Sequence, residues 1–167
     1  MIIEELKRFV TPKRSMRMIK VIFVCLGNIC RSPMAEFLLK DMINKKGLID
    51  EFIIESAGTS NEEEGNPVHY GTKNKLSEVG ISVDGKYARQ FKKDDYDKFD
   101  YIIAMEQSNI RDIYRIVGED KENKIYRLLD FSNNPRDISD PWYTHNFEIT
   151  YNDIIEGLEA FWNFLKK

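Results

Sequence analysis

The amino-acid sequence predicts an α/β fold of three layers, in which helices cover both faces of a parallel β-sheet. Short apolar runs, typical of buried strands, alternate along the chain with longer segments whose apolar residues recur at helical spacing. This alternation favours a parallel sheet because each crossover helix packs back onto one of its faces. At 167 residues, without an internal repeat or a linker, the chain has the length of a single domain.

The first predicted strand and helix lie on either side of a tight loop. Residues 21–24 are apolar throughout, as expected of a strand that is buried on both faces. Apolar residues between positions 34 and 43 form a helical stripe, and Gly47 should end that helix. Ser32 and Pro33 precede the stripe, and these residue types are typical of an N-cap and a first helical position.

The loop between this strand and helix combines the features of an anion-binding site. Gly27 and Asn28 tolerate the positive φ of a tight loop. The helix directs its free N–H groups and the positive end of its dipole at the loop. Cys25 begins the loop and Arg31 ends it, so the thiol should ionise easily and the guanidinium can grip two phosphate oxygens. A lone strand cysteine is usually inert packing, but the complete strand–loop–helix string favours a functional interpretation.

The rest of the chain continues the alternation of strands and helices. Apolar runs predict further strands at residues 52–56, 100–105 and 124–131. Helical periodicity predicts further helices at residues 68–79, 107–117 and 151–165. Polar and turn-forming residues predict loops at residues 60–67 and 132–146. The charged part of the first loop is most simply a solvated surface, and its functional alternative is the rim of a site.

Residues 1–17 are less typical of a compact domain, so we assign the single domain to residues 18–167. Basic residues outnumber acidic residues in this extension, and Pro12 would interrupt a helix. Its apolar start is too short for a secretory signal and is followed by acidic residues. Three interpretations of the extension stay open: a protein that starts at Met18, a segment added to the natural chain, and a short extra helix.

The composition argues against several classes of function. Apolar residues make up 42% of the chain and charged residues 32%, with a formal net charge of −3. A nucleic-acid binder should carry a basic face, and no apolar run is long enough for a membrane span. The two Cys and two His fit no recurrent ligand spacing, so we expect no metal and no cofactor. So few cysteines favour the reducing cytoplasm.

Residues 25–33, Cys-Leu-Gly-Asn-Ile-Cys-Arg-Ser-Pro, resemble the phosphate-binding loop of the low-molecular-weight protein tyrosine phosphatase family. Other segments similar to this family are residues 56–59 (Ser-Ala-Gly-Thr), 88–90 (Ala-Arg-Gln) and the Asp-Pro-aromatic stretch at 140–142. The resemblance spans residues 18–164 and implies a four-stranded sheet of order 2-1-3-4. In such sheets ligands bind where the strand order reverses, here between strands one and three.

The resemblance implies a protein tyrosine phosphatase that hydrolyses phosphotyrosine in proteins and releases inorganic phosphate, with acid phosphatase activity on aryl phosphates. A thiolate beside an arginine indicates a cysteinyl-phosphate intermediate, formed by in-line attack of Cys25 on phosphorus. The Arg31 guanidinium and backbone N–H groups would hold the phosphate oxygens. These N–H groups belong to Leu26, Gly27, Asn28, Ile29, Cys30 and Arg31. The Ser32 hydroxyl would donate to the thiolate, and the Asn28 amide would pin the loop.

The leaving group must take a proton, and Asp140 is the best candidate for the general acid. Pro141 stiffens the chain after it, and Asp140 matches the acid of the family's Asp-Pro-aromatic loop. As a carboxylate it would then activate the hydrolytic water. Asp137 is the second candidate, and an Asp-Pro pair can also be an ordinary turn. Trp142 and Tyr143 would wall an aromatic ring, which favours phosphotyrosine, unless they only pack against the protein.

Cys30 lies inside the same loop and gives the resemblance a regulatory implication. In some members of the family the nucleophile forms a reversible disulfide with a neighbouring cysteine, which protects it from over-oxidation. Cys30 would be that partner of Cys25, and the alternative is a buried small side chain.

Several positions depart from the family's pattern and bear on specificity. The residues at these positions are Glu62 for a common aromatic, His69-Tyr70-Gly71 for an acidic-Pro-Arg stretch, Lys86 for a common histidine and Glu106 for an aspartate. These departures leave the expected chemistry intact, but they change the residues expected at the rim of the site and so bear on its substrate specificity. The acidic run at residues 62–64 predicts that acidic phosphopeptides are disfavoured by like-charge repulsion.

Three other functions fit parts of this pattern. A thiol-dependent arsenate reductase of related fold would need further cysteines, and none follows Cys30. In protein-arginine phosphatases the position of Ile29 is typically smaller and polar, so Ile29 favours aryl phosphates. A non-catalytic phosphate or phosphotyrosine binder would be expected to lack the nucleophile or the acid.

Overall fold

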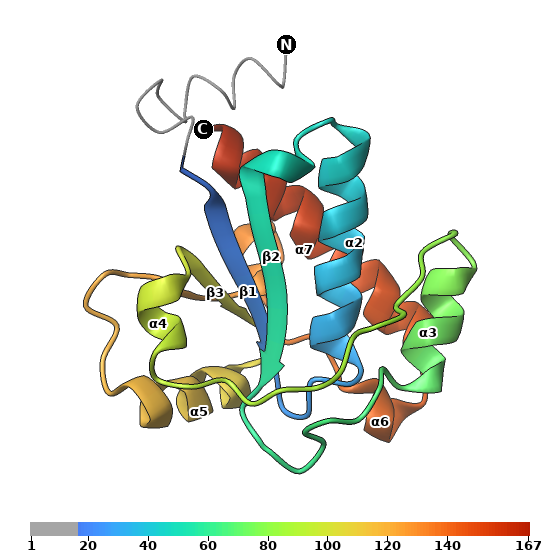
Figure 1. Cartoon of the computed structure of the whole chain (residues 1–167), viewed down its shortest axis with the longest axis horizontal. Coiled ribbons are helices and arrows are strands. Elements are labelled where there is room, and N and C mark those ends of the chain that lie inside the picture. Colours follow the sequence, from blue (N-terminus) through green and yellow to red (C-terminus); the bar gives the residue numbers. More distant parts are fainter. Residues whose placement is uncertain (1–16) are drawn as a thin grey trace.

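The computed structural model describes residues 17–167, which form one four-stranded parallel sheet with helices around it (Figure 1). The strands are β1 (Ile19–Cys25), β2 (Phe52–Gly58), β3 (Tyr101–Ala104) and β4 (Ile125–Arg127). Their order is β2-β1-β3-β4, which confirms the order that the resemblance implied. The predicted N-terminal extension, except Arg17, lies outside the described residues, so the domain boundary at residue 18 stays a prediction.

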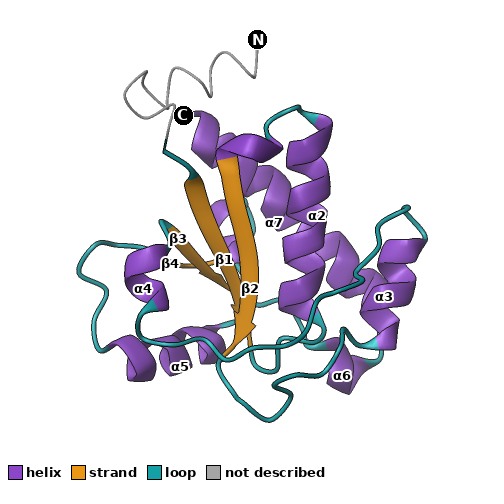
Figure 2. Cartoon of the chain, viewed as in Figure 1, coloured by secondary structure: helices purple, strands orange, loops and turns teal. Residues whose placement is uncertain are grey.

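Helices pack on both sides of the sheet, as Figures 1 and 2 show. One side carries α2 (Arg31–Lys45), α3 (Tyr70–Ser77) and α7 (Phe147–Lys166), and the other carries α4 (Asp95–Lys98) and α5 (Gln107–Val117). Short helical turns complete the chain: η1 (Ile49–Glu51), η2 (Leu128–Phe131) and α6 (Pro141–Thr144). The predicted three-layer α/β architecture is therefore confirmed.

The central strand β1 is apolar throughout because each of its faces meets a separate part of the core. Val21 and Phe23 join the apolar cluster formed with α2 and α7. Ile22 and Val24 join a second cluster on the side of α5. All four side chains are completely buried, and each contributes about 1.5–3 kcal/mol of hydrophobic stabilisation. This burial anchors the strand that carries Cys25 at its end.

Several elements differ from the sequence-based prediction. The strand expected at residues 124–131 ends at Arg127, and η2 follows because Leu128 packs so closely on α7 that a Cβ at Gly157 would collide with it. The loop expected at residues 132–146 contains the short helix α6. The helix α4 was not predicted, because its four residues are too few to show a helical period.

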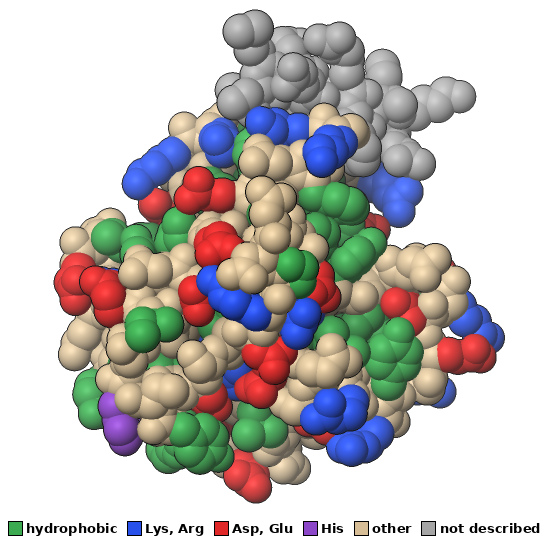
Figure 3. All heavy atoms as spheres, turned by 180° about the vertical axis from the view of Figure 1, so that it is seen from behind, with side chains coloured by type: hydrophobic (Ala, Val, Ile, Leu, Met, Phe, Trp, Pro, Cys, Tyr) green, Lys and Arg blue, Asp and Glu red, His purple; other side chains and the backbone are tan. Residues whose placement is uncertain are grey.

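The surface of the molecule shows no division into a basic and an acidic half in the view of Figure 3, where Lys and Arg are interspersed with Asp and Glu. This face therefore lacks the basic stripe that is typical of nucleic-acid binders. None of the helices in residues 17–167 combines the length and the apolar character that crossing a bilayer requires. Over the same residues, no group of three or more His, Cys, Asp or Glu is arranged to hold a metal ion.

Candidate active site

The loop between β1 and α2 lies at the carboxyl edge of the sheet, beside the strand where the order reverses (Figure 1). It packs against the end of β2, where the Thr59 N–H donates to the carbonyl oxygen of Cys25 at 2.9 Å. Gly58 permits this contact, because a Cβ there would lie only 2.7 Å from the Leu26 carbonyl oxygen. The Ser-Ala-Gly-Thr segment thus supports the loop from behind.

The loop presents a run of backbone donors at the start of α2. Within residues 17–167, no backbone carbonyl oxygen accepts a hydrogen bond from the N–H groups of residues 26–31. Of the two residues that tolerate a positive φ, Asn28 adopts one of 59° and Gly27 does not. The Asn28 side chain fixes this turn, because its Oδ1 accepts a hydrogen bond from the Arg89 N–H at 3.0 Å. Free N–H groups beside a helix N-terminus form a site for an anion.

Cys25 ends β1 with its sulfur close to a hydroxyl group. Its side chain is buried, and Sγ lies 3.1 Å from Ser32 Oγ. The predicted N-cap role of Ser32 is wrong, because α2 begins at Arg31 and Cys30 occupies the N-cap position. The Ser32 hydroxyl is instead held between Cys25 and the Asn28 amide, which donates to it at 2.8 Å. Tertiary partners therefore outweigh the local capping preference.

Arg31 is completely enclosed, with 1% of its surface exposed. Its Nη1 donates to Glu106 Oε2 at 2.5 Å and to the Ile138 carbonyl oxygen at 2.8 Å. Its Nη2 donates to Asp140 Oδ2 at 3.2 Å. Burial alone would lower the pKa of the guanidinium, but the charges of Cys25, Asp140 and Glu106 outweigh burial and raise it. The site therefore holds a permanent cation in a fixed orientation.

Asp140 begins α6 as its N-cap, and its Oδ1 accepts a hydrogen bond from the Trp142 N–H at 3.0 Å. Its other oxygen faces Arg31, so the structure brings Asp140 and the loop together. Asp137 lies elsewhere, where its Oδ1 accepts hydrogen bonds from the Gln107 N–H and the Arg127 guanidinium. Of the two candidates for the acid, only Asp140 lies in the site.

A cavity of about 150 Å³ joins these groups. Its lining consists of Cys25, Leu26, Gly27, Ile29, Cys30, Arg31, Ser60, Glu62, Glu63, Asp140, Trp142 and Tyr143. The two aromatic side chains are largely exposed beside it, with 51% of Trp142 and 73% of Tyr143 accessible. Asn28 and Ser32 do not line the cavity but support the loop from inside. The polar loop at residues 60–67 does contribute to the rim.

Cys30 faces the same cavity but differs from Cys25 in its surroundings. Burial, with smaller contributions from the charges of Cys25 and Asp140, raises the pKa of the Cys30 thiol from 9.0 to about 12. Both cysteines are free thiols in this structure. The reversible disulfide between them stays a prediction.

Glu106, which the sequence analysis connected only with the rim of the site, bonds directly to Arg31. It follows β3 at the carboxyl edge of the sheet and is the N-cap of α5. Because β3 pairs with β1, the end of β3 necessarily lies beside the loop, and this relation could have identified Glu106. Lys86, another departure from the family's pattern, lies behind the loop rather than on the rim and bonds to the Ser56 carbonyl oxygen.

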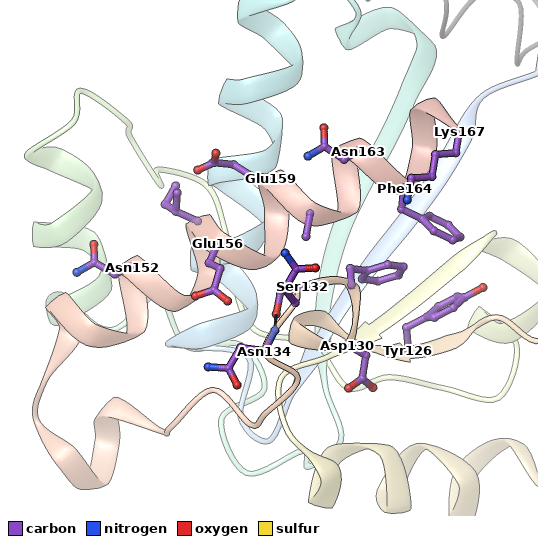
Figure 4. Close-up of a pocket in the computed structure, with 14 residues that line it drawn as sticks. Tyr126, Asp130, Ser132, Asn134, Asn152, Glu156, Glu159, Asn163, Phe164 and Lys167 are labelled. Carbon is purple, nitrogen blue, oxygen red and sulfur yellow. Dashed lines mark hydrogen bonds between the residues drawn. The ribbon is translucent and has the colours of Figure 1, made fainter.

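A larger hollow of about 840 Å³ lies between α7 and the segment around η2 (Figure 4). Amide and carboxylate side chains surround it, and the aromatic rings of Tyr126 and Phe164 lie at one end. Phe131 also lines it. It holds no cysteine and none of the predicted site residues. The smaller cavity at the loop is therefore the candidate active site, because only it combines a nucleophile, a cation and a proton carrier.

Comparisons with known proteins point to one family. The family model described as "Low molecular weight phosphotyrosine protein phosphatase" matches residues 20–167. The low molecular weight protein-tyrosine-phosphatase YfkJ of Bacillus subtilis is 47% identical over 144 residues, which cover 85% of this chain and 92% of the relative. The phosphatase named PtpA of Staphylococcus epidermidis is 40% identical over 151 residues, which cover 90% of this chain and 96% of the relative.

Solved structures of phosphatases are similar to this chain over most of its length. The crystal structure of YfkJ from Bacillus subtilis matches with a TM-score of 0.84 and 46% identity, covering 86% of this chain and 92% of that one. The crystal structure of DARP, a Drosophila arginine phosphatase, matches with a TM-score of 0.82 and 29% identity. This second match covers 89% of this chain and 99% of the neighbour.

Proposed function

Because the chain belongs to the low molecular weight phosphotyrosine protein phosphatase family, we propose that it hydrolyses phosphotyrosine in proteins through a cysteinyl-phosphate intermediate. The observation that carries the proposal is the meeting of three groups in one cavity: the Cys25 thiol, the Arg31 guanidinium and the Asp140 carboxyl group. These are the nucleophile, the phosphate clamp and the proton carrier that phosphoester cleavage needs.

In the first step the Cys25 thiolate attacks phosphorus in line with the ester oxygen. A sulfur–phosphorus bond forms and the bond from phosphorus to the phenolic oxygen breaks. The Arg31 guanidinium and the N–H groups of residues 26–31 hold the three equatorial oxygens, whose charge grows in the transition state. Asp140 gives its proton to the departing phenolate, so the tyrosine side chain of the substrate protein leaves as a neutral phenol.

In the second step a water molecule attacks the same phosphorus atom. Asp140, now a carboxylate, takes a proton from this water, and the sulfur–phosphorus bond breaks. The Ser32 hydroxyl, 3.1 Å from the sulfur, donates a hydrogen bond to the departing thiolate. Inorganic phosphate is released, and Asp140 is protonated again for the next cycle.

The aromatic side chains beside the cavity suit a phosphotyrosyl protein as the partner. Trp142 and Tyr143 stand next to Asp140 and can pack against the ring of the substrate. Because the nucleophile must stay reduced, we further propose the reducing cytoplasm as the place of action. A relay of cysteines, as an arsenate reductase would need, has no candidate after Cys30 in this sequence.

Arginine phosphatase activity is the second candidate, because one neighbour of similar structure carries that name. Ile29 lines the cavity, and its apolar side chain favours an aryl group over a charged guanidinium. Hydrolysis of p-nitrophenyl phosphate, a phosphotyrosyl peptide and phosphoarginine by the same preparation distinguishes the two activities. We expect the two aryl phosphates to be hydrolysed much faster. Preference for phosphoarginine, or no hydrolysis of any of the three, would contradict the proposal.

A further inference from the structure

The rim of the candidate active site continues into a row of aromatic rings that leads to α3. Tyr70, the first residue of α3, is 72% exposed. Its ring stacks on that of His69 with 4.4 Å between the ring centroids, and the His69 ring meets the edge of the Trp142 ring at 5.7 Å. Trp142 lines the cavity, whereas no residue of α3 does. The row therefore connects the cavity to a helix outside it, and Figure 1 shows α3 and α6 next to each other.

Two hydrogen bonds attach the start of α3 to the loop between β1 and α2. The His69 N–H donates to the Ile29 carbonyl oxygen at 2.9 Å. The Thr72 hydroxyl, which is completely buried, donates to the Cys30 carbonyl oxygen at 3.0 Å. Because Ile29 and Cys30 both line the cavity, these bonds hold Tyr70 in a fixed relation to the place where a phosphate would bind.

The His69 ring, on which Tyr70 stacks, is itself held in place. Its Nδ1 accepts a hydrogen bond from the Gly71 N–H at 3.0 Å. It also stacks on the ring of Phe147, the first residue of α7, with 5.4 Å between the centroids. Gly71 makes room for this contact, because a Cβ at that position would collide with the Phe147 ring. A ring that is already held loses little freedom when a partner binds, so Tyr70 is suited to anchor one.

The exposed rings form a contiguous group within reach of a bound substrate. Single exposed aromatic side chains are ordinary, but a contiguous apolar group is typical of an interaction surface. Tyr70, Trp142 and Tyr143 are each more than half exposed. The two centroid distances place the Tyr70 ring within about 10 Å of the Trp142 ring. An extended peptide advances about 3.3–3.6 Å per residue, so a side chain two or three positions from a phosphotyrosine in the cavity can reach Tyr70.

We propose that Tyr70 is a specificity-determining residue, which binds an aliphatic or aromatic side chain two or three positions from the phosphotyrosine of the substrate protein. The flanking segment of the substrate is the occupant because the row of rings is continuous with the cavity that takes the phosphotyrosine. Contact between an apolar side chain and the Tyr70 ring removes apolar surface of both partners from water. The proposal rests on the proposed function and adds a second feature to its substrate.

Phosphotyrosyl peptides that differ at one position test the proposal. Each peptide carries leucine or alanine at one of four positions, two or three residues before or after the phosphotyrosine, in an otherwise identical sequence. In the wild type we expect leucine at one or more of these positions to raise kcat/KM about fivefold over alanine, mainly through a lower KM. In Tyr70→Ala this preference for leucine should disappear.

Two matched variants separate contact with the substrate from a structural effect. Tyr70→Phe keeps the ring and should keep the preference for leucine. Tyr114→Ala removes a tyrosine that is 40% exposed on α5, on the other side of the sheet, and should also keep it.

The ratio of kcat/KM for the leucine peptide to kcat/KM for p-nitrophenyl phosphate should fall in Tyr70→Ala alone, because the small ester does not extend to Tyr70. A variant that disturbed the catalytic groups would lower both values alike. Thermal unfolding of each variant reports whether it is folded, which we expect of Tyr70→Ala because the side chain is mostly exposed.

Several outcomes would overturn the proposal without touching the proposed function. One is an unchanged preference for leucine in Tyr70→Ala, and another is a wild type that does not distinguish leucine from alanine at any of the four positions. A wild-type dimer that becomes a monomer in Tyr70→Ala, with the preference unchanged, would assign the rings to a second copy of the chain.

Failure of the proposed function has a different signature, because the wild type would then hydrolyse no p-nitrophenyl phosphate. In that case the affinities of Cys25→Ser for the leucine and alanine peptides, measured with and without Tyr70→Ala, still report whether Tyr70 binds the leucine. A higher affinity for leucine that depends on Tyr70 supports the contact, and equal affinities contradict it.

Discussion

Asp140 Oδ2 lies 3.2 Å from Nη2 of Arg31, although 109 residues separate the two in the sequence. The contact joins the N-cap of α6 to the first residue of α2. It places a proton carrier and a phosphate-binding cation on the same side of the Cys25 loop. The fold achieves this because the chain returns to the carboxyl edge of the sheet after β4.

Arg31→Lys should reduce kcat/KM for p-nitrophenyl phosphate by about 10²–10³. A lysine has one ammonium group and cannot bond to Glu106 and Ile138 while also offering a planar fork to phosphate. Arg115→Lys is the control, since that side chain is 74% exposed on α5, and it should leave the activity unchanged. Comparable activity of Arg31→Lys and the wild type would contradict the role of Arg31.

Asp140→Asn should lower kcat by about 10²–10⁴, because asparagine can still cap α6 but cannot give a proton. The loss should be larger for phenyl phosphate than for p-nitrophenyl phosphate, whose leaving group needs less help. Asp137→Asn is the matched change in the same segment and should be nearly neutral, because Asp137 bonds to Gln107 and Arg127 outside the cavity. Steady-state kinetics on both esters measure these losses. A larger loss of kcat in Asp137→Asn than in Asp140→Asn would contradict the assignment of Asp140 as the general acid.

The raised pKa of Cys30 predicts that the protein loses stability at alkaline pH. Its pKa in the folded chain is about 12, above the ordinary 9.0 of the unfolded chain, because burial disfavours the thiolate. The unfolded chain therefore loses this proton first. The contribution of Cys30 to the free energy of unfolding is complete below pH 9.0 and declines between pH 9.0 and about 12, by up to about 1.4 kcal/mol per pH unit.

Urea unfolding of the wild type and Cys30→Ser, on either side of that ordinary pKa, measures this contribution. Serine does not titrate in this range, so the difference in free energy of unfolding between the two proteins should shrink as the pH rises. A difference that stays constant across the range would show that the Cys30 thiol is not shifted.

The acidic rim should select among phosphotyrosyl peptides. Glu62 and Glu63 line the cavity, so peptides with basic residues beside phosphotyrosine should have a severalfold higher kcat/KM than acidic ones at low salt. The preference should weaken at high salt and in Glu62→Gln. Glu119→Gln, at a side chain 71% exposed and remote from the cavity, serves as the control. Equal turnover of both peptide types at low salt would contradict a role of the acidic rim in substrate selection.

Much of the fold followed from local pattern. The buried run at residues 21–24 and the stripe of α7 are long or strongly periodic, so hydrophobic patterning sufficed for them. The junction of β4 and η2 did not follow, because it depends on how Leu128 fits against Gly157 of α7. That contact joins distant parts of the chain, and no local pattern encodes it.

In the candidate site, too, some residues could be predicted from local sequence and others depend on tertiary contacts. Cys25, Arg31 and Asp140 could be predicted because their residue types and spacing carry the chemistry directly. The prediction that Ser32 is the N-cap of α2 was wrong. Its hydroxyl contacts the Cys25 sulfur, a tertiary partner, instead of capping the helix. Glu106 was connected only with the rim, because its bond to Arg31 joins residues that are 75 positions apart in the sequence.

Covalent trapping of the intermediate tests the central claim most directly. Asp140→Asn mixed with an aryl phosphate and quenched in acid should carry one phosphoryl group on Cys25 by mass spectrometry, because hydrolysis of the intermediate is slowed. Cys25→Ser treated in the same way should carry none and release no phenol. A phosphoryl group on another residue, or substrate turnover by Cys25→Ser, would contradict the account.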